Sequence, residues 1–184
     1  MAKFDREIAR FRGNEADYRK RGILLMEAAY PRAVVALFGI HLPFSPLLFG
    51  LDIDFANYDT WPVSVRFINP FTGDGVTAEQ LPNLVPIGKK VHISGEGVDG
   101  EVLTGQPLVQ SHAGHSPFLC HRGVREYHNH PAHSGDPWAL HRGSAEGRLA
   151  RIIELVHKYG VAPAQPTFQV QARFAGYQVP QPVE

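Results

Sequence analysis

Apolar residues recur with helical spacing from Lys3 to about Ala29, beginning at Phe4 and Ile8. The segment is rich in helix-forming residues, and its charged positions fall between the apolar ones, so the pattern predicts an N-terminal helix with one solvated side. Glycine weakens a helix interior, and we expect an interruption near Gly13. Pro31 ends the helix, because proline cannot continue one.

Three short apolar segments follow, and each has the pattern of a β-strand. Residues 33–40 form a continuous apolar run between two prolines, which is typical of a buried strand. Residues 47–55 alternate in their second half, so Asp52 and Asp54 are expected to face solvent. Residues 63–68 alternate in the same way. Successive short strands joined by short turns favour an antiparallel meander of about four strands.

A long segment rich in Gly, Pro, Asn and Asp runs from Asn69 to about Gln110. Within it, only residues 91–93 and 101–103 have the composition of short strands. Loops of this length are uncommon in compact domains and are usually functional or mobile. This segment leads directly into the part of the chain that is richest in histidine.

The most regular helical pattern lies between Ser144, which is suited to cap a helix N-terminus, and Gly160, which is suited to end one. Its apolar stripe consists of Leu149, Ile152, Ile153 and Val156. We therefore expect an α+β fold in a single domain over residues 1–162. Residues 163–184 are expected to form a last strand or an extended arm.

Charge and cysteine content narrow the possible functions. The 18 basic and 18 acidic residues balance, so no overall positive field favours nucleic acid or anionic lipid as a partner. A single cysteine excludes an internal disulfide and fits a reducing cytoplasm. The start of the chain lacks an apolar signal core, and no apolar run approaches the roughly 20 residues needed to span a bilayer. These features predict a soluble cytoplasmic protein.

Candidate chemistry is concentrated in residues 111–142, which contain the only cysteine and seven of the ten histidines. If residues 125–130 are extended, alternate side chains share one face, and a residue beyond Pro131 can fold back to the same point. Thiolate, imidazole and carboxylate are ligands that zinc accepts. Four ligands of zinc or a similar transition metal could therefore come from five candidates, which are Cys120, Glu126, His128, His130 and His133.

Two other interpretations of this segment stay open. Cys120 could be a nucleophile activated by His121, Arg122, Arg125 or the nearby imidazoles. The histidines could instead be polar residues of a surface loop, with the cysteine as a small buried apolar side chain.

Other residues within 111–142 are expected to lie in solvent or to have structural roles. His112 and His115 form a second pair that could join the site but is more typical of solvated loop residues. Trp138 is expected to pack the segment onto the core. His141 and Arg142 are expected to flank the following helix.

The order of these parts resembles the ubiquitin-conjugating-enzyme (UBC) fold. The shared order is an N-terminal helix, a meander ending in FGLDIDFANYDTWPVSVRF, a long loop, a cysteine in PFLC, a tryptophan eighteen residues later and an amphipathic helix. The segment EYHNHPAHSGDPW, with Cys120 before it, is similar to a bacterial UBC-like family of predicted metal-binding proteins with a Cys/Glu/His/His motif. That family is associated with ubiquitin-like proteins, activating enzymes and JAB-type peptidases.

This resemblance implies roles for individual residues. Cys120 would match the family cysteine, Glu126 its glutamate, and two of His128, His130 and His133 its histidines. The chain would then be a component of a bacterial ubiquitin-like conjugation system with a metal site, and its expected partners would be a ubiquitin-like protein and the corresponding activating enzyme.

Two alternatives accompany that expectation. One is a transferase in which Cys120 accepts the partner's carboxyl group, His128 or His133 tunes the thiolate, and Glu126 orients the histidine or the incoming amine. The chain lacks the His-Pro-Asn tripeptide that precedes the cysteine of ordinary conjugating enzymes. The other alternative is a partner-binding module without catalysis.

Overall fold

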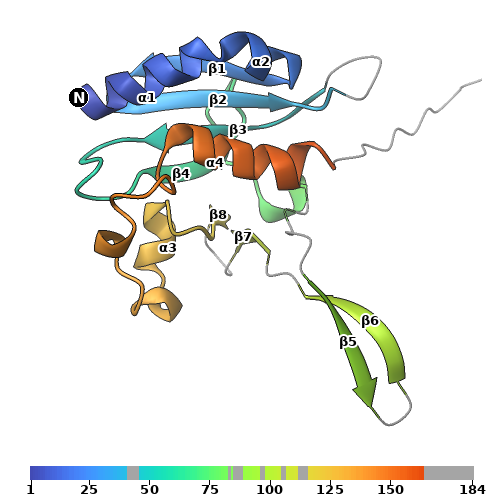
Figure 1. Cartoon of the computed structure of the whole chain (residues 1–184). Helices are drawn as coiled ribbons and strands as arrows, with labels where there is room; N and C mark the ends of the chain where they lie inside the picture. The colour runs from blue at the N-terminus through green and yellow to red at the C-terminus, as the bar shows by residue number, and fades with distance from the viewer. Residues whose placement is uncertain are drawn as a thin grey trace, which may run out of the picture.

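The computed structural model describes residues 1–40, 46–82, 84, 89–95, 98–104, 107–111 and 116–163 (Figure 1). Its helices are α1 (Ala2–Gly13), α2 (Glu15–Lys20), α3 (Arg125–Asn129) and α4 (Leu149–Val156). Its strands are β1 (Ile23–Ala29), β2 (Arg32–Phe38), β3 (Leu47–Asp54), β4 (Ser64–Ile68), β5 (Lys89–Gly95), β6 (Val98–Thr104), β7 (Val109–Gln110) and β8 (Phe118–Leu119).

The strands form one antiparallel sheet of six and a separate hairpin. The sheet order is β1-β2-β3-β4-β8-β7, so the three predicted strands, β2, β3 and β4, form an antiparallel meander, which β1 extends on one side. Strands β5 and β6 form the hairpin, which extends away from the sheet in Figure 1. The mixed α+β class and the strands predicted at residues 33–40, 47–55 and 63–68 are confirmed, as are the short strands around 91–93 and 101–103.

The predicted N-terminal helix is confirmed only in its first part. It is broken at Asn14, as expected, but it ends at Lys20, and residues 23–29 form strand β1 instead of continuing the helix. Gly22 makes the change of direction with a φ of 75°. Strand β1 then pairs with β2 along its length, and the backbone hydrogen bonds of this hairpin outweigh the helical spacing of its side chains.

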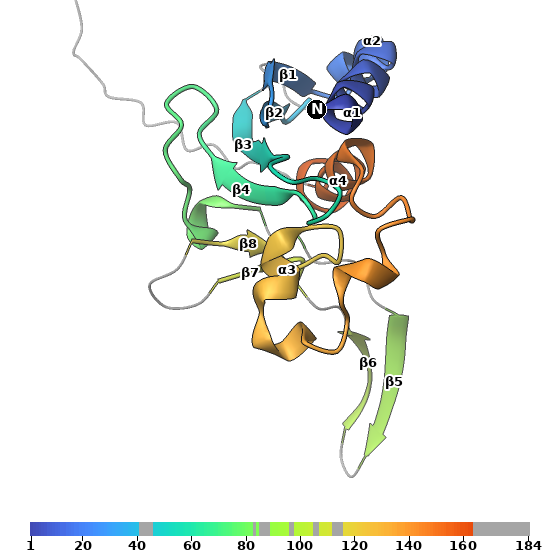
Figure 2. The ribbon, with the colours of Figure 1, turned by 90° about the vertical axis from the view of Figure 1, so that its left-hand side faces the viewer.

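Helices α1 and α4 lie next to each other on the same face of the sheet (Figure 2). The apolar stripe of α4 is buried as predicted. The core beneath the two helices includes Phe4, Ile8, Phe11, Val35, Leu37, Leu51, Ile53, Val65, Leu149, Ile152, Ile153 and Val156. No helix in the described part of the chain combines the length and apolar character needed to cross a membrane.

Asp52, on the opposite face of β3, was expected to face solvent, but the structure shows that it is buried. Its side chain is only 4% exposed, because Arg32 of β2 and Arg66 of β4 cover its carboxylate from both neighbouring strands. Asp52 lies directly across from Arg66 in the register of β3 and β4. Opposite charges on adjacent strands thus stabilise the sheet where the alternation alone indicated solvent.

Helix α4 begins later than predicted. Its N-cap is Arg148, whereas the Ser144 hydroxyl accepts the N–H of Glu146 and donates to the carbonyl of His141 in a turn before the helix. The helix then continues into a π-helical turn over His157–Val161, past the predicted end at Gly160. The arm predicted for residues 163–184 lies, from residue 164 onward, outside the described residues.

Gly22 provides a test of the hairpin. A Cβ at this position would overlap the carbonyl oxygen of Phe38, and the positive φ disfavours any other residue. We expect Gly22→Ala to lower the free energy of unfolding by more than about 1 kcal/mol, as measured by urea denaturation followed by circular dichroism.

Gly13→Ala is the matched control. A Cβ on Gly13 meets nothing within 4 Å, and alanine favours a helix. This variant should keep or slightly raise stability, and an equal loss in both variants would contradict the role assigned to Gly22.

Candidate active site

The segment that carries the candidate residues is folded differently from the prediction. Residues Arg125–Asn129 form helix α3, not an extended strand. Side chains two positions apart on a helix point in nearly opposite directions, so Glu126 and His128 do not share a face. The helix is anchored next to β4, because the N–H of Arg125 donates to the carbonyl of Val63, the residue before that strand, over 2.8 Å.

Glu126 is bound to strand β4. Its carboxylate accepts the hydroxyl hydrogen of Ser64 and, at 3.2 Å, the backbone N–H of Val65. Both carboxylate oxygens therefore bind the start of β4, and Glu126 acts as a bridge between α3 and β4.

His128 is bound through both ring nitrogens. Nδ1 lies 2.9 Å from the carbonyl oxygen of Asp136, and Nε2 lies 2.8 Å from that of Arg122. Carbonyl oxygens only accept hydrogen bonds, so both ring nitrogens face backbone acceptors and neither is directed at Cys120. His128 joins the two ends of the loop around α3.

Cys120 and His133 are the two candidates that meet. The Cys120 Sγ lies 3.5 Å from Nε2 of His133, which folds back after Pro131. The His133 ring stacks on Tyr127 with centroids 3.8 Å apart, and the Tyr127 hydroxyl donates to Asp136 over 2.8 Å. The imidazole beside the thiol is thus held in place by a ring that is itself anchored.

His130 lies at the border of this pair. Its ring centroid is 5.5 Å from that of His133, and its other side stacks on Phe118 at 6.0 Å. Its Nδ1 accepts the N–H of Ala132 over 3.3 Å. The structure therefore gathers Cys120 and His133, with His130 adjacent, while Glu126 and His128 are engaged elsewhere.

Within the described residues, no group of three or more His, Cys, Asp or Glu side chains is arranged as a metal site. His112 and His115, the second predicted pair, lie outside the described residues.

Two of the groups expected to activate the cysteine, Arg125 and His121, are bound elsewhere. Arg125 donates to the carbonyl oxygens of Ala56 and Pro62, in the connection between β3 and β4. His121 contacts Glu146 over 2.8 Å, and its Nδ1 accepts the N–H of Gly123. Burial lowers the pKa of His121, while the Glu146 carboxylate opposes that shift.

Gly123 and Trp138 fix the loop that leads to the site, and sequence reasoning identified only the second of them. A Cβ on Gly123 would overlap the carbonyl oxygen of Glu146, so only glycine permits this close approach. Trp138 is buried as expected, and its indole N–H donates to the carbonyl of Asp59 over 3.0 Å. In the sequence, the feature that could have identified Gly123 is its position between Cys120 and the residues that form α3.

Comparison with known proteins now places the chain in a family. The model of the Y4jH family, described as Y4jH-like, matches residues 1–164. The chain belongs to the Y4jH family. It is also 39% identical, over 186 aligned positions, to an uncharacterized protein of Sinorhizobium fredii (strain NBRC 101917 / NGR234), y4jH, with 97% of this chain and 91% of y4jH covered. Neither the family description nor the name of the relative states an activity. The resemblance to UBC-like proteins stays a prediction.

The environment of Cys120 predicts an unusual pH profile for a Y4jH-family cysteine. Burial raises the pKa of the Cys120 thiol, so the folded protein should contain less thiolate at a given pH than the unfolded chain. Because Cys120 is the only cysteine, its alkylation by iodoacetamide can be followed by intact mass. We expect the rate to rise with pH around a midpoint above that of the same protein in urea.

Rates normalised to their alkaline plateau separate the pKa from simple accessibility. A midpoint at or below that of the unfolded protein would contradict the buried environment.

Proposed function

We propose that this Y4jH-family protein is a UBC-like component of a bacterial ubiquitin-like conjugation system and that Cys120 accepts the partner's C-terminal acyl group. The observation that carries the proposal is the 3.5 Å contact between the Cys120 Sγ and Nε2 of His133. A partly exposed thiol beside an oriented imidazole is the arrangement that nucleophilic cysteine catalysis needs.

The order of elements supports this proposal. An N-terminal helix and a four-stranded meander precede the cysteine, and α4 follows it on the same face of the sheet as α1. This is the order on which the UBC resemblance rests. Strand β8 pairs with β4 through Phe118 and presents Cys120 immediately after its last residue, Leu119.

The proposed reaction is a thioester exchange. The Sγ of Cys120 attacks the carbonyl carbon of the thioester that joins the ubiquitin-like protein to its activating enzyme. His133 takes the thiol proton, the bond to the enzyme's sulfur breaks, and His133 returns the proton to that sulfur. Because burial raises the pKa of Cys120, the thiol stays protonated at rest and requires this base. Glu126 and His128 position α3 and its loop.

Trapping of the adduct tests the proposal. Incubation with the ubiquitin-like protein, its activating enzyme and ATP should give a covalent adduct that a reducing agent cleaves, and Cys120→Ala should abolish it. His133→Gln should slow its formation by about 100-fold, the usual contribution of a general base. His130→Gln, which changes the neighbouring imidazole, should retain most of the rate.

If no adduct forms in the wild type, Cys120 is not an acceptor. Partner binding that survives Cys120→Ala and His133→Gln in that case would indicate a non-catalytic binding module.

A metal-binding function is the second candidate, with fewer ligands than the five residues that the sequence predicted. Cys120 lies 3.5 Å from His133, and His130 is the neighbour of His133, so donors of the types that zinc accepts lie next to one another; a metal would have to draw the three together. Glu126 and His128 do not fit the ligand set, because β4 and two carbonyl oxygens occupy them. Three protein ligands leave a position for water, and zinc in such a site supplies Lewis-acid chemistry.

Elemental analysis distinguishes the two candidates. A metal centre predicts about one zinc per chain after purification without chelators, absent from Cys120→Ala and His130→Gln but kept in His128→Gln. Wild-type protein without stoichiometric metal would reject the metal centre and leave the thioester proposal standing.

A further inference from the structure

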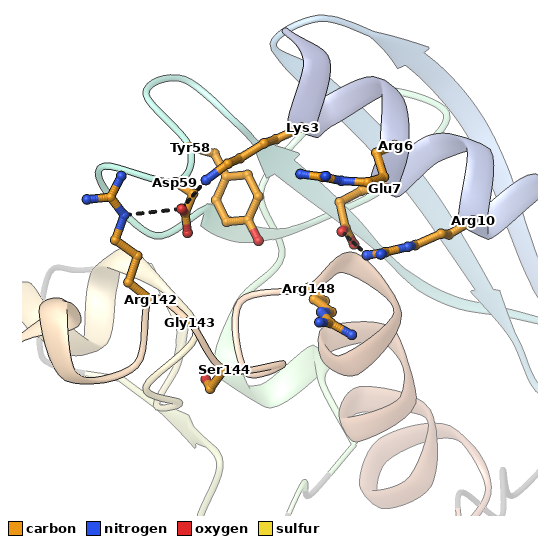
Figure 3. A pocket seen from close by; sticks show the side chains of 10 residues that line it. All are labelled: Lys3, Arg6, Glu7, Arg10, Tyr58, Asp59, Arg142, Gly143, Ser144 and Arg148. Atoms are coloured by element: carbon orange, nitrogen blue, oxygen red, sulfur yellow. Dashed lines mark hydrogen bonds and ion pairs between the residues drawn. The ribbon is translucent and has the colours of Figure 1, made fainter.

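A cavity of about 220 Å³ opens between α1, the connection after β3 and the segment before α4 (Figure 3). Its lining residues share neither a side chain nor a role with the Cys120 site. They are Lys3, Arg6, Glu7, Arg10, Tyr58, Asp59, Arg142, Gly143, Ser144 and Arg148.

The charge of this cavity is strongly positive in a chain whose overall formal charge is zero. Five lining side chains are cationic and two are anionic, which leaves a formal charge of +3. The helix supplies three of the cations, because Lys3, Arg6 and Arg10 recur at intervals of three and four residues and so project from one face of α1. That spacing is visible in the sequence alone.

The two carboxylates of the cavity, Asp59 and Glu7, already bind other groups of the protein. Asp59 accepts from both Lys3 and Arg142. Glu7 contacts Arg10 over 2.9 Å and accepts the N–H of Leu149 over 3.2 Å. These pairs hold three of the cations in place around the cavity, as the dashed lines in Figure 3 show.

Arg6 and Arg148 are the remaining two of the five cationic side chains that line the cavity. Neither forms an ion pair with any residue that the structure describes. They come from opposite walls of the cavity, one from α1 and the other from the N-cap of α4. Two guanidinium groups facing one space are suited to an oxyanion, which each can bind through two parallel N–H donors.

The cavity also contains a neutral hydrogen-bond donor. Tyr58 lines it, and its hydroxyl points into it in Figure 3. Burial, with the charges of Glu7 and Asp59, raises the pKa of Tyr58 to about 12, while Arg148 and Arg6 lower it. The phenol therefore keeps its proton at neutral pH and can donate to an anion.

We propose that this pocket binds the phosphoryl group of a small molecule, held by Arg6 and Arg148 with Tyr58 as an additional donor. A phosphate dianion offsets more of the +3 charge than a carboxylate does, and it accepts several hydrogen bonds at once. The volume is below the roughly 300–1,000 Å³ of typical small-molecule pockets. The pocket thus encloses the phosphoryl group, and the remainder of the ligand extends outward.

Isothermal titration calorimetry of the full chain with inorganic phosphate, pyrophosphate and AMP tests the proposal. The double variant Arg6→Gln/Arg148→Gln should weaken binding of each probe by about 100-fold, or about tenfold for each guanidinium group removed. The matched control is Arg12→Gln/Arg19→Gln. It removes the same charge, from α1 and α2, and neither residue lines the pocket.

Binding by the wild type that disappears in the first double variant and persists in the control supports the site. Tighter binding of AMP than of inorganic phosphate would further assign a role to the organic part of the ligand. Equal weakening in both double variants, or no binding of any probe at millimolar concentration, would overturn it. Thermal unfolding of each variant establishes that the fold is retained, and the adduct assay on Cys120 reports separately on the proposed transfer.

Discussion

Burial of one face of β2 and β3 beneath α1 and α4 is the interaction on which the rest of the molecule depends. Phe11 and Ile152 approach Val35 and Leu51 from helices more than 130 residues apart in the chain, and all four are almost completely buried. Each such side chain contributes roughly 1.5–3 kcal/mol relative to exposure. The cysteine loop and the basic pocket are both built at the margins of this core, one beside strands β4 and β8 and the other where the ends of α1 and α4 meet.

Much of this core was predictable, because several signals agreed along the central strands. Residues 33–40, 47–55 and 63–68 combine apolar or alternating patterns with turn residues at their ends, and all three are strands. The prediction for residues 23–29 was wrong because their spacing suits a helix, whereas their pairing with β2 is a tertiary interaction that no local pattern reveals. The prediction for Asp52 was wrong for a related reason, since its burial depends on arginines from two neighbouring strands.

The location of the site could be predicted from the sequence, but the set of residues that form it could not. The proximity of His133 to Cys120 followed from the turn expected at Pro131. Glu126 and His128 have the chemistry of ligands, yet Glu126 is bound by a serine and a backbone N–H of β4, and His128 lies between two backbone carbonyls of its own loop. A sequence shows what a side chain is able to bind, whereas competition among possible partners is decided only by the fold. The same holds for the cationic pocket, whose walls come from three separate segments.

The buried carboxylate of Glu7 has a consequence for how the protein is made. Its hydrogen-bond partner, the N–H of Leu149, lies 142 residues further along the chain. During synthesis, α1 therefore leaves the ribosome long before its charged group and the apolar face around it can be covered by α4. Until then this face is an exposed hydrophobic surface of the kind that chaperones bind. Completion of the core is thereby tied to the synthesis of α4.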